Sequence, residues 1–344
     1  MESAVAGVRR RHTAPHLGTR DRGNSTWSPD LWPPDRTDAG SHPAPPSNPP
    51  YDTDSTKRYG RSVTPRTAAT RARIREDVDA RLRALADQGG GDLVGELAFP
   101  VALTAIAGII GFPPGTRIGT LYTWAVGLLD DADGKITTAM TEWLGTPSAW
   151  PARGLVGRLL RHEDPLTGSG SELLPTVRLL LSTGTEPPFR SLATLLYAVL
   201  SDPALLETAR ADESGATAVI QECWRWECPL TWVLRRCSTG TELCGARLRE
   251  GDLVCVNLAS ANRDETRWAD ADRLAPHRRP LPHLAMGTGP HICLGRHLAA
   301  LEAGEVLAGL ARTAPPVWPD RPALDTDGIE GRGFRSPRRL VPRW

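Results

Sequence analysis

Apolar residues recur along much of the chain at the spacing of a helix that buries one face, which predicts a largely helical fold. In residues 73–86 the apolar positions lie three or four apart and form a single stripe. This stripe consists of Ile74, Val78, Leu82 and Leu85. Residues 101–112 are apolar almost throughout, but the run is too short to cross a bilayer, so it predicts a buried core helix.

The longest predicted helix covers residues 171–200 and contains two consecutive prolines. Because Pro187 and Pro188 have no backbone N–H, they remove the hydrogen bonds to the carbonyls of Thr183 and Gly184. We therefore expect the helix to bend at these residues.

Residues 1–50 differ in kind from the rest of the chain. They are rich in proline and arginine and show no apolar periodicity, so they cannot bury enough surface to offset the entropy of the chain. We expect residues 1–50 to be disordered and residues 51–344 to form one domain. Lys57 and Lys135 are the only lysines, as expected of a GC-rich bacterial gene. A truncated or frameshifted N-terminus would resemble residues 1–50, and a natural disordered arm is the alternative.

Charge and cysteine content exclude several classes of protein. The net charge of +1 gives no reason to expect a nucleic-acid partner or binding to an acidic membrane surface. No signal peptide or membrane anchor is recognisable, so we expect a cytoplasmic protein. Five of the six cysteines fall on predicted helices or strands without the spacing of a zinc site or a disulfide framework. These five are Cys223, Cys228, Cys237, Cys244 and Cys255.

The sixth cysteine, Cys293, lies in a glycine-rich turn just before a long apolar helix. Gly287, Gly289 and Gly295 leave room for a planar macrocycle to approach the backbone. Backbone N–H groups and the N-terminal end of the next helix would stabilise a thiolate. A dinucleotide-binding turn is excluded because Ile292 stands where the third glycine would be needed.

Residues 286–295 resemble the heme-binding signature of the cytochrome P450 family, Phe-Gly-x-Gly-x-His-x-Cys-x-Gly, with Met286 in place of phenylalanine. The resemblance implies a mainly α fold with a small β component and an incomplete N-terminal sheet. It also implies heme b (iron protoporphyrin IX), with Cys293 as axial ligand of the iron. By the same resemblance, His291 and Arg235 bind the heme propionates, with Arg236 as the rival to Arg235.

A second motif, Glu222-x-x-Arg225, places two opposite charges one helical turn apart. Its order and distance relative to the cysteine turn are those of the same family. The resemblance implies that Glu222, Arg225 and Arg273 form a buried charge triad beneath the heme.

Two further regions depart from the family pattern. At the centre of the 171–200 helix, Glu186 keeps the family's acid, but Pro187 replaces the alcohol that completes a proton relay. Three alternatives are open. A substrate hydroxyl or an ordered water completes the relay, Thr185 or Ser182 completes it, or the reaction needs no relay. In residues 56–65, Thr56 and Gly60 replace the usual propionate-binding histidine and arginine, and Arg58 or Arg61 is expected to substitute.

The resemblance implies a heme-thiolate monooxygenase, an oxidoreductase in which Glu186 and Thr185 are the catalytic candidates. We expect a monomer that oxidises a small hydrophobic substrate with dioxygen and two electrons in bacterial secondary metabolism. A ferredoxin-type donor would supply the electrons by docking near Arg296 and His297. The alternative is a degenerate or non-monooxygenase homologue: peroxide-dependent, phenol-coupling, or a non-catalytic recruitment partner.

Overall fold

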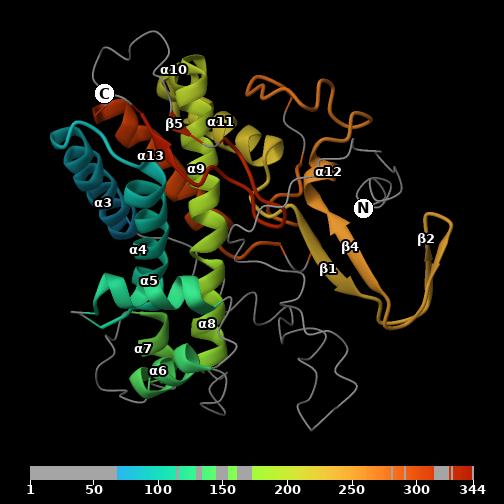
Figure 1. Ribbon diagram of the computed structural model, residues 1–344. Coiled ribbons are helices and arrows are strands. Elements are labelled where there is room, and N and C mark those ends of the chain that lie inside the picture. The colour runs from blue at the N-terminus through green and yellow to red at the C-terminus, as the bar shows by residue number, and fades with distance from the viewer. Residues whose placement is uncertain are drawn as a thin grey trace.

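The structure is a computed structural model in which helices form one body and short strands extend from its side (Figure 1). It describes residues 68–113, 116–128, 134–144, 154–160, 173–279, 282–289, 292–313, 325–326 and 328–342. The predicted disordered segment 1–50 and the segment 56–65, with Arg61, lie outside the described residues. The prediction of a mainly α fold with a small β component is confirmed.

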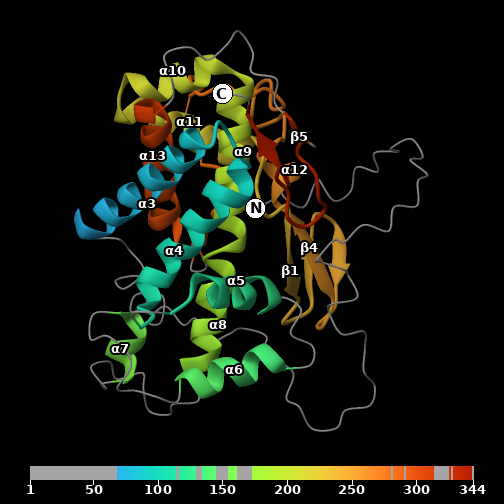
Figure 2. The same cartoon turned by 60° about the vertical axis from the view of Figure 1, so that its left-hand side comes forward.

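The stripe predicted in residues 73–86 is the buried face of helix α3 (Ala68–Asp87). All four of its apolar side chains are buried. Helix α3 lies against helix α13 (Arg296–Thr313), which follows the cysteine turn (Figure 2). At the edge of this contact, Arg75 Nε donates to Glu305 Oε2 over 3.0 Å. Residues more than two hundred positions apart therefore build one helix pair.

Gly309 allows α3 and α13 to approach each other closely. A Cβ on Gly309 would lie 2.6 Å from Val78 Cγ1 and 2.9 Å from Leu82 Cδ1, which is tighter than van der Waals contact. We expect Gly309→Val to lower the free energy of unfolding by about 1–3 kcal/mol through overpacking. Gly304 of the same helix is the control, because a Cβ there would meet no atom within 4 Å. Gly304→Ala should raise the free energy of unfolding by up to about 1 kcal/mol. Urea unfolding of both variants measures the difference. Equal effects of the two substitutions would contradict the close packing at Gly309.

The apolar run of residues 101–112 forms most of helix α4 (Phe99–Ile110), which follows the π-helical turn η2 (Val94–Ala98). Eight of the twelve α4 residues are buried, which confirms the prediction of a core helix. The helix ends at Gly111, whose φ of 84° is left-handed and favours glycine. A Cβ on Gly111 would lie 2.2 Å from Gly154 Cα, so these two glycines also permit a close backbone contact.

The long central helix predicted for residues 171–200 is interrupted and forms helices α8 (Leu173–Thr183) and α9 (Glu186–Ser201). Figure 1 shows them following one another along the centre of the molecule. Pro187 and Pro188 lie in the first turn of α9. Backbone N–H groups in a first turn have no acceptor within the helix, so the absence of these N–H groups costs no hydrogen bond there. The prolines therefore begin a new helix after the break at Gly184 and Thr185.

Other elements surround this central axis. The remaining helices are α5 (Ile118–Gly127), α6 (Lys135–Leu144), α7 (Leu155–Leu160), α10 (Pro203–Ala211), α11 (Glu213–Trp226) and α12 (Leu258–Asn262). The antiparallel strand pairs are β1 (Trp232–Arg236) with β4 (Leu253–Asn257), β2 (Thr241–Leu243) with β3 (Ala246–Leu248), and β5 (Asp325–Thr326) with β6 (Leu340–Val341). In the described part of the chain no single helix is long and apolar enough to cross a membrane, although Leu173–Ser201 and Pro203–Ala211, bent by 106°, together meet the length and composition required.

Candidate functional site

The turn that carries Cys293 is closed by a backbone hydrogen bond from Cys293 N to Met286 O, 2.8 Å long. Gly287 and Gly289 have φ values of +68° and +70°. Only glycine adopts this left-handed conformation without strain, so both glycines are required by the shape of the turn. The turn ends where α13 begins, at Arg296. Cys293 is thus held beside the first turn of a long helix, as the sequence predicts.

Cys293 is an exposed residue, and backbone donors point at its sulfur. Desolvation by the surrounding protein raises the thiol pKa. The N–H groups of Gly295 and Arg296 and the charge of Arg296 act in the opposite direction. A cationic metal ion bound to the sulfur would add a stronger stabilisation of the thiolate than these groups supply. The turn therefore suits a metal-bound thiolate better than a free one.

Two glycines of the turn leave open space beside the backbone. A Cβ on Gly289 would meet no atom within 4 Å, and a Cβ on Gly295 would meet only Cys293 Sγ at 4.0 Å. A single sulfur donor, backbone N–H groups and clearance at the glycines together fit a heme approaching the turn. His291 lies outside the described residues. Among those described, no group of three or more His, Cys, Asp or Glu side chains could hold a metal ion by itself.

Arg235 and Arg236, the two propionate-binding candidates, end strand β1 and are both exposed. Arg235 Nη1 donates to Leu234 O over 2.8 Å, and Arg236 Nη1 donates to Gly251 O over 2.8 Å. Each guanidinium thus donates to a backbone carbonyl. Successive side chains of a strand point to opposite faces, so only one of the two can face the heme side. Their assignment stays a prediction.

The Glu222–Arg225 motif forms a buried ion pair on helix α11. Arg225 donates to both carboxylate oxygens of Glu222, over 2.8 and 2.9 Å. Its remaining donors bind three backbone carbonyls, those of Asn262, Ala271 and Arg273. Arg225 is 1% exposed. The guanidinium therefore ties α11 to the loop that leads toward the cysteine turn.

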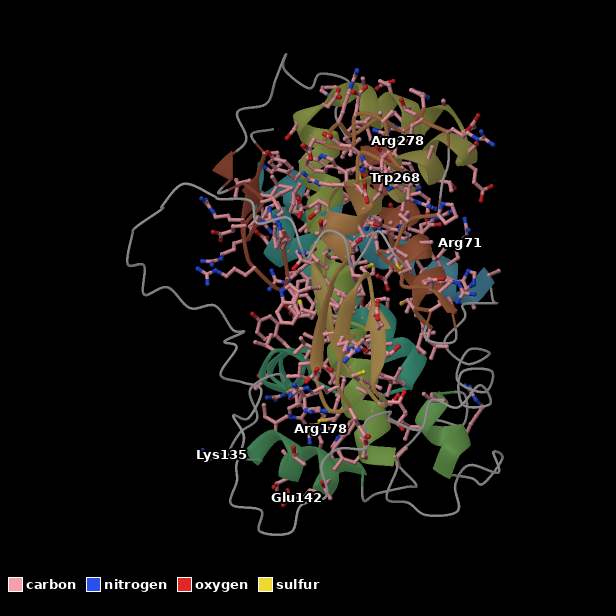
Figure 3. All side chains as sticks on the ribbon, turned by 90° about the vertical axis from the view of Figure 1, so that its right-hand side faces the viewer. Arg71, Lys135, Glu142, Arg178, Trp268 and Arg278 are labelled. Atoms are coloured by element: carbon pink, nitrogen blue, oxygen red, sulfur yellow. The ribbon has the colours of Figure 1, made fainter. Side chains whose placement is uncertain are left out.

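The second arginine at Glu222 is Arg278 and not Arg273, which corrects the predicted triad. Arg278 Nε donates to Glu222 Oε1 over 2.8 Å, whereas Arg273 contributes only its carbonyl to the cluster. Figure 3 labels Arg278 close to Trp268, and Arg278 Nη1 donates to Ala269 O, next to Trp268 in the chain. The Arg225 guanidinium lies over the Trp268 ring, 5.3 Å from its centroid. Arg273 and Arg278 both lie in an irregular loop without periodicity, so residue spacing could not distinguish them.

Opposing effects act on the Glu222 carboxyl. Burial is the largest single effect and raises its pKa. Hydrogen bonds from Arg225, from the Ala275 N–H and from Arg278 together lower the pKa by more than burial raises it. The resulting pKa lies below the usual value, so Glu222 is ionised at neutral pH. A buried carboxylate with this many donors stabilises the cluster only while all partners remain.

At the break between α8 and α9, the hydroxyls predicted to replace the missing alcohol are bonded to backbone carbonyls of α8. Thr185 is 1% exposed, and its Oγ1 donates to Leu181 O over 2.7 Å. Ser182 Oγ donates to Leu179 O over 3.2 Å. Each hydroxyl would have to leave its carbonyl before it could donate a proton elsewhere.

Glu186 forms an ion pair with Arg190, a residue that the sequence analysis missed. Arg190 Nη2 lies 2.6 Å from Glu186 Oε1, and Arg190 Nε donates to the same oxygen over 2.7 Å. Arg190 Nη1 also donates to Ser336 Oγ over 3.2 Å, and the guanidinium lies 5.0 Å from the centroid of the Phe189 ring. The spacing of four residues on one helix is the signal that could have found this pair.

Apolar side chains are exposed on the neighbouring helix α5. Ile118, Tyr122 and Val126 recur every four residues and are 49%, 52% and 39% exposed. The Tyr122 ring packs edge-on against Phe99 of α4, with centroids 4.7 Å apart. Helix α5 in turn contacts α8. This α5 stripe provides an apolar surface close to the central helix.

Comparison with known proteins agrees with this geometry. Residues 216–312, which include most of α11 and most of α13, match the family model described as Cytochrome P450. The chain is 31% identical over 316 residues to the cytochrome P450 monooxygenase PikC of Streptomyces venezuelae, covering 87% of this chain and 75% of that protein. It is also 31% identical over 297 residues to cytochrome P450 107B1 of Saccharopolyspora erythraea, covering 83% and 72%.

A solved structure of P450BioI in complex with a fatty-acid-ligated acyl carrier protein has a TM-score of 0.72 and 27% identity, covering 84% of this chain and 79% of that chain. The chain belongs to the cytochrome P450 family, and it has that family's mainly α fold. Proteins of this family carry a heme iron. The bacterial relatives of this chain include one protein named as a monooxygenase and one named as a vitamin D(3) 25-hydroxylase.

Proposed function

We propose that the chain is a heme-thiolate monooxygenase that oxidises a small hydrophobic molecule, in bacterial secondary metabolism. The observation that carries the proposal is the Cys293 turn, which combines two left-handed glycines, an exposed cysteine and two N–H groups aimed at its sulfur. A buried structural cysteine would need none of these features. When bound, heme b would supply reductive activation of dioxygen.

Residues of this chain would have separate roles around the heme. Cys293 would hold the iron, and the N–H groups of Gly295 and Arg296 would moderate the charge on sulfur. His291, Arg235 and Arg61 would bind the propionates. The α5 stripe suits an apolar substrate. A ferredoxin-type protein would donate electrons on the face that carries Arg296 and His297.

Heme titration with a matched pair of cysteine variants tests this proposal. The unaltered protein should bind heme and, after reduction and addition of carbon monoxide, give the Soret band of thiolate ligation. Cys293→Ser should lose that band. Cys255→Ser is the control, because Cys255 is also exposed but lies on strand β4. A thiolate band that persists in Cys293→Ser would refute the proposal.

Glu186 would hold the proton-donating position despite the loss of the alcohol. Its Oε1 accepts a hydrogen bond from Arg190 Nε and forms an ion pair with Arg190 Nη2, so the carboxyl is oriented by its own helix. We expect Glu186→Gln to lower the rate of substrate oxidation about 100-fold, the effect of losing a general acid. Glu207→Gln is the control, because Glu207 pairs with Arg210 on the exposed helix α10. Equal rates in both variants, measured as product formed per minute, would remove Glu186 from the reaction.

A peroxide-dependent activity is the second candidate. It is favoured by Pro187 in place of the alcohol and by the bonding of the Thr185 hydroxyl to Leu181 O. Product formation from hydrogen peroxide alone, without reductant or ferredoxin, would favour this activity over the monooxygenase reaction. Product formation only with reductant and dioxygen would exclude it.

A further inference from the structure

The cysteine turn is anchored to the rest of the protein by two side chains outside it. Leu284 and Ala285 directly precede Met286, the first residue of the turn. The Met286 carbonyl accepts a hydrogen bond from Cys293 N. Leu284 N donates to Asn262 Oδ1 over 2.7 Å, and Ala285 N donates to His283 Nδ1 over 3.2 Å. Two consecutive amides are thus held immediately before the turn.

His283 connects this segment to helix α11. Because its Nδ1 accepts a hydrogen bond from Ala285 N, the ring proton lies on Nε2. Nε2 can then donate to Gln221 Oε1, which lies 2.9 Å away. Gln221 directly precedes Glu222 on α11, so the histidine joins the turn to the helix that carries the buried ion pair.

The surroundings favour the neutral ring. Burial and the positive charge of Arg225 lower the pKa of His283 to about 4, although Glu222 acts in the opposite direction. The ring also lies edge-on to Trp224, with centroids 6.5 Å apart, and Trp224 Nε1 donates to Ser191 Oγ on helix α9. An imidazolium would lose the Nδ1 acceptor, so only the neutral ring makes both hydrogen bonds.

We propose that His283, held in its Nε2–H form between Gln221 and the Ala285 amide, is a positioning residue that fixes the cysteine turn for binding heme. The role of this anchoring in heme binding rests on the proposed function, whereas the anchoring itself does not. Asn262 holds the adjacent amide, so the two side chains act on one segment from two sides.

Hydrogen exchange in the heme-free protein tests the anchoring directly. In His283→Ala and in Gln221→Ala, the amides of residues 284–287 and 293 should exchange about fivefold faster, the factor for one lost hydrogen bond. His277→Ala is the control, because His277 is an exposed histidine of the preceding loop. The helical amides of α13 should keep their exchange rates in all three variants. Equal rates in His283→Ala and His277→Ala would overturn the proposal.

The heme-loaded protein supplies a second readout. After reduction and carbon monoxide binding, His283→Ala and Gln221→Ala should show a lower ratio of thiolate-type to non-thiolate Soret absorbance than His277→Ala. An unchanged ratio would overturn the positioning role. If the unaltered protein shows no thiolate band at all, the proposed function fails, and the exchange rates still decide whether His283 anchors the turn.

Discussion

Replacing Arg225 by methionine is expected to lower the free energy of unfolding by about 3–5 kcal/mol, because the change leaves Glu222 as a buried carboxylate without its main partner. Arg225 makes two hydrogen bonds to Glu222 and donates to three backbone carbonyls. Methionine fills part of the volume but supplies none of these donors. Urea unfolding followed by far-ultraviolet circular dichroism measures the change.

Arg273→Met is the matched control for this prediction. Its side chain is exposed and makes no ion pair with Glu222, so the free energy of unfolding should change by about 0.5 kcal/mol or less. Arg278→Met should resemble Arg225→Met in direction, because Arg278 also donates to Glu222. Should Arg273→Met destabilise the protein as strongly as Arg225→Met, the cluster described for α11 would be incorrect.

Replacing Glu302 by leucine is expected to stabilise the protein, and the gain should grow as the pH rises. Glu302 lies on α13 and is 1% exposed, and neither carboxylate oxygen has a hydrogen-bond partner among the described residues. Burial raises the pKa of this carboxyl well above its usual value. The folded protein therefore keeps the proton at a pH where the unfolded chain has lost it.

The sign of the pH dependence follows from this difference in bound protons. Above the unfolded pKa of about 4.5, the folded state binds one more proton than the unfolded state, so stability falls by about 1.4 kcal/mol per pH unit up to the folded pKa. Glu302→Leu removes this loss. Urea unfolding at pH 4, 5.5 and 7 should show a difference between variant and unaltered protein that increases with pH. A constant difference would show that Glu302 titrates normally.

Periodic apolar positions explain why much of the fold could be predicted from the sequence. The buried face of α3 and the core helix α4 follow from side-chain spacing alone, because each helix has one apolar side. A bend of the central helix at Pro187 and Pro188 was predicted, because these residues lack the donors that a helix interior needs. The sequence predicted a bend within one helix, whereas the structure has two helices with the prolines at the start of the second.

The candidate site was only partly predictable, because its supporting contacts join residues far apart in the chain. The cysteine turn was visible as a local motif of glycines around one thiol. The choice of Arg278 over Arg273, by contrast, depends on how an irregular loop folds onto Glu222. The contacts of Asn262 with Leu284 and of His283 with Gln221 span 22 and 62 residues. Such pairings follow from tertiary packing, for which residue spacing gives no signal.

The structure also weakens one alternative for the missing alcohol. Thr185 and Ser182 were expected as candidates, but both hydroxyls are bonded to backbone carbonyls of α8. Under the proposed function, a hydroxyl on the substrate or an ordered water is therefore the better candidate to complete a proton relay with Glu186. Comparing the oxidation rates of a substrate and of its deoxy analogue would distinguish a substrate hydroxyl from water.

X-ray absorption at the iron edge of the heme-loaded protein tests the central claim most directly, because it identifies the atoms bound to the metal. The unaltered protein should show one sulfur neighbour in addition to the four porphyrin nitrogens, and this sulfur should be absent in Cys293→Ser. An iron surrounded only by nitrogen and oxygen in the unaltered protein, or a sulfur that persists in Cys293→Ser, would contradict the assignment of Cys293 as the heme ligand.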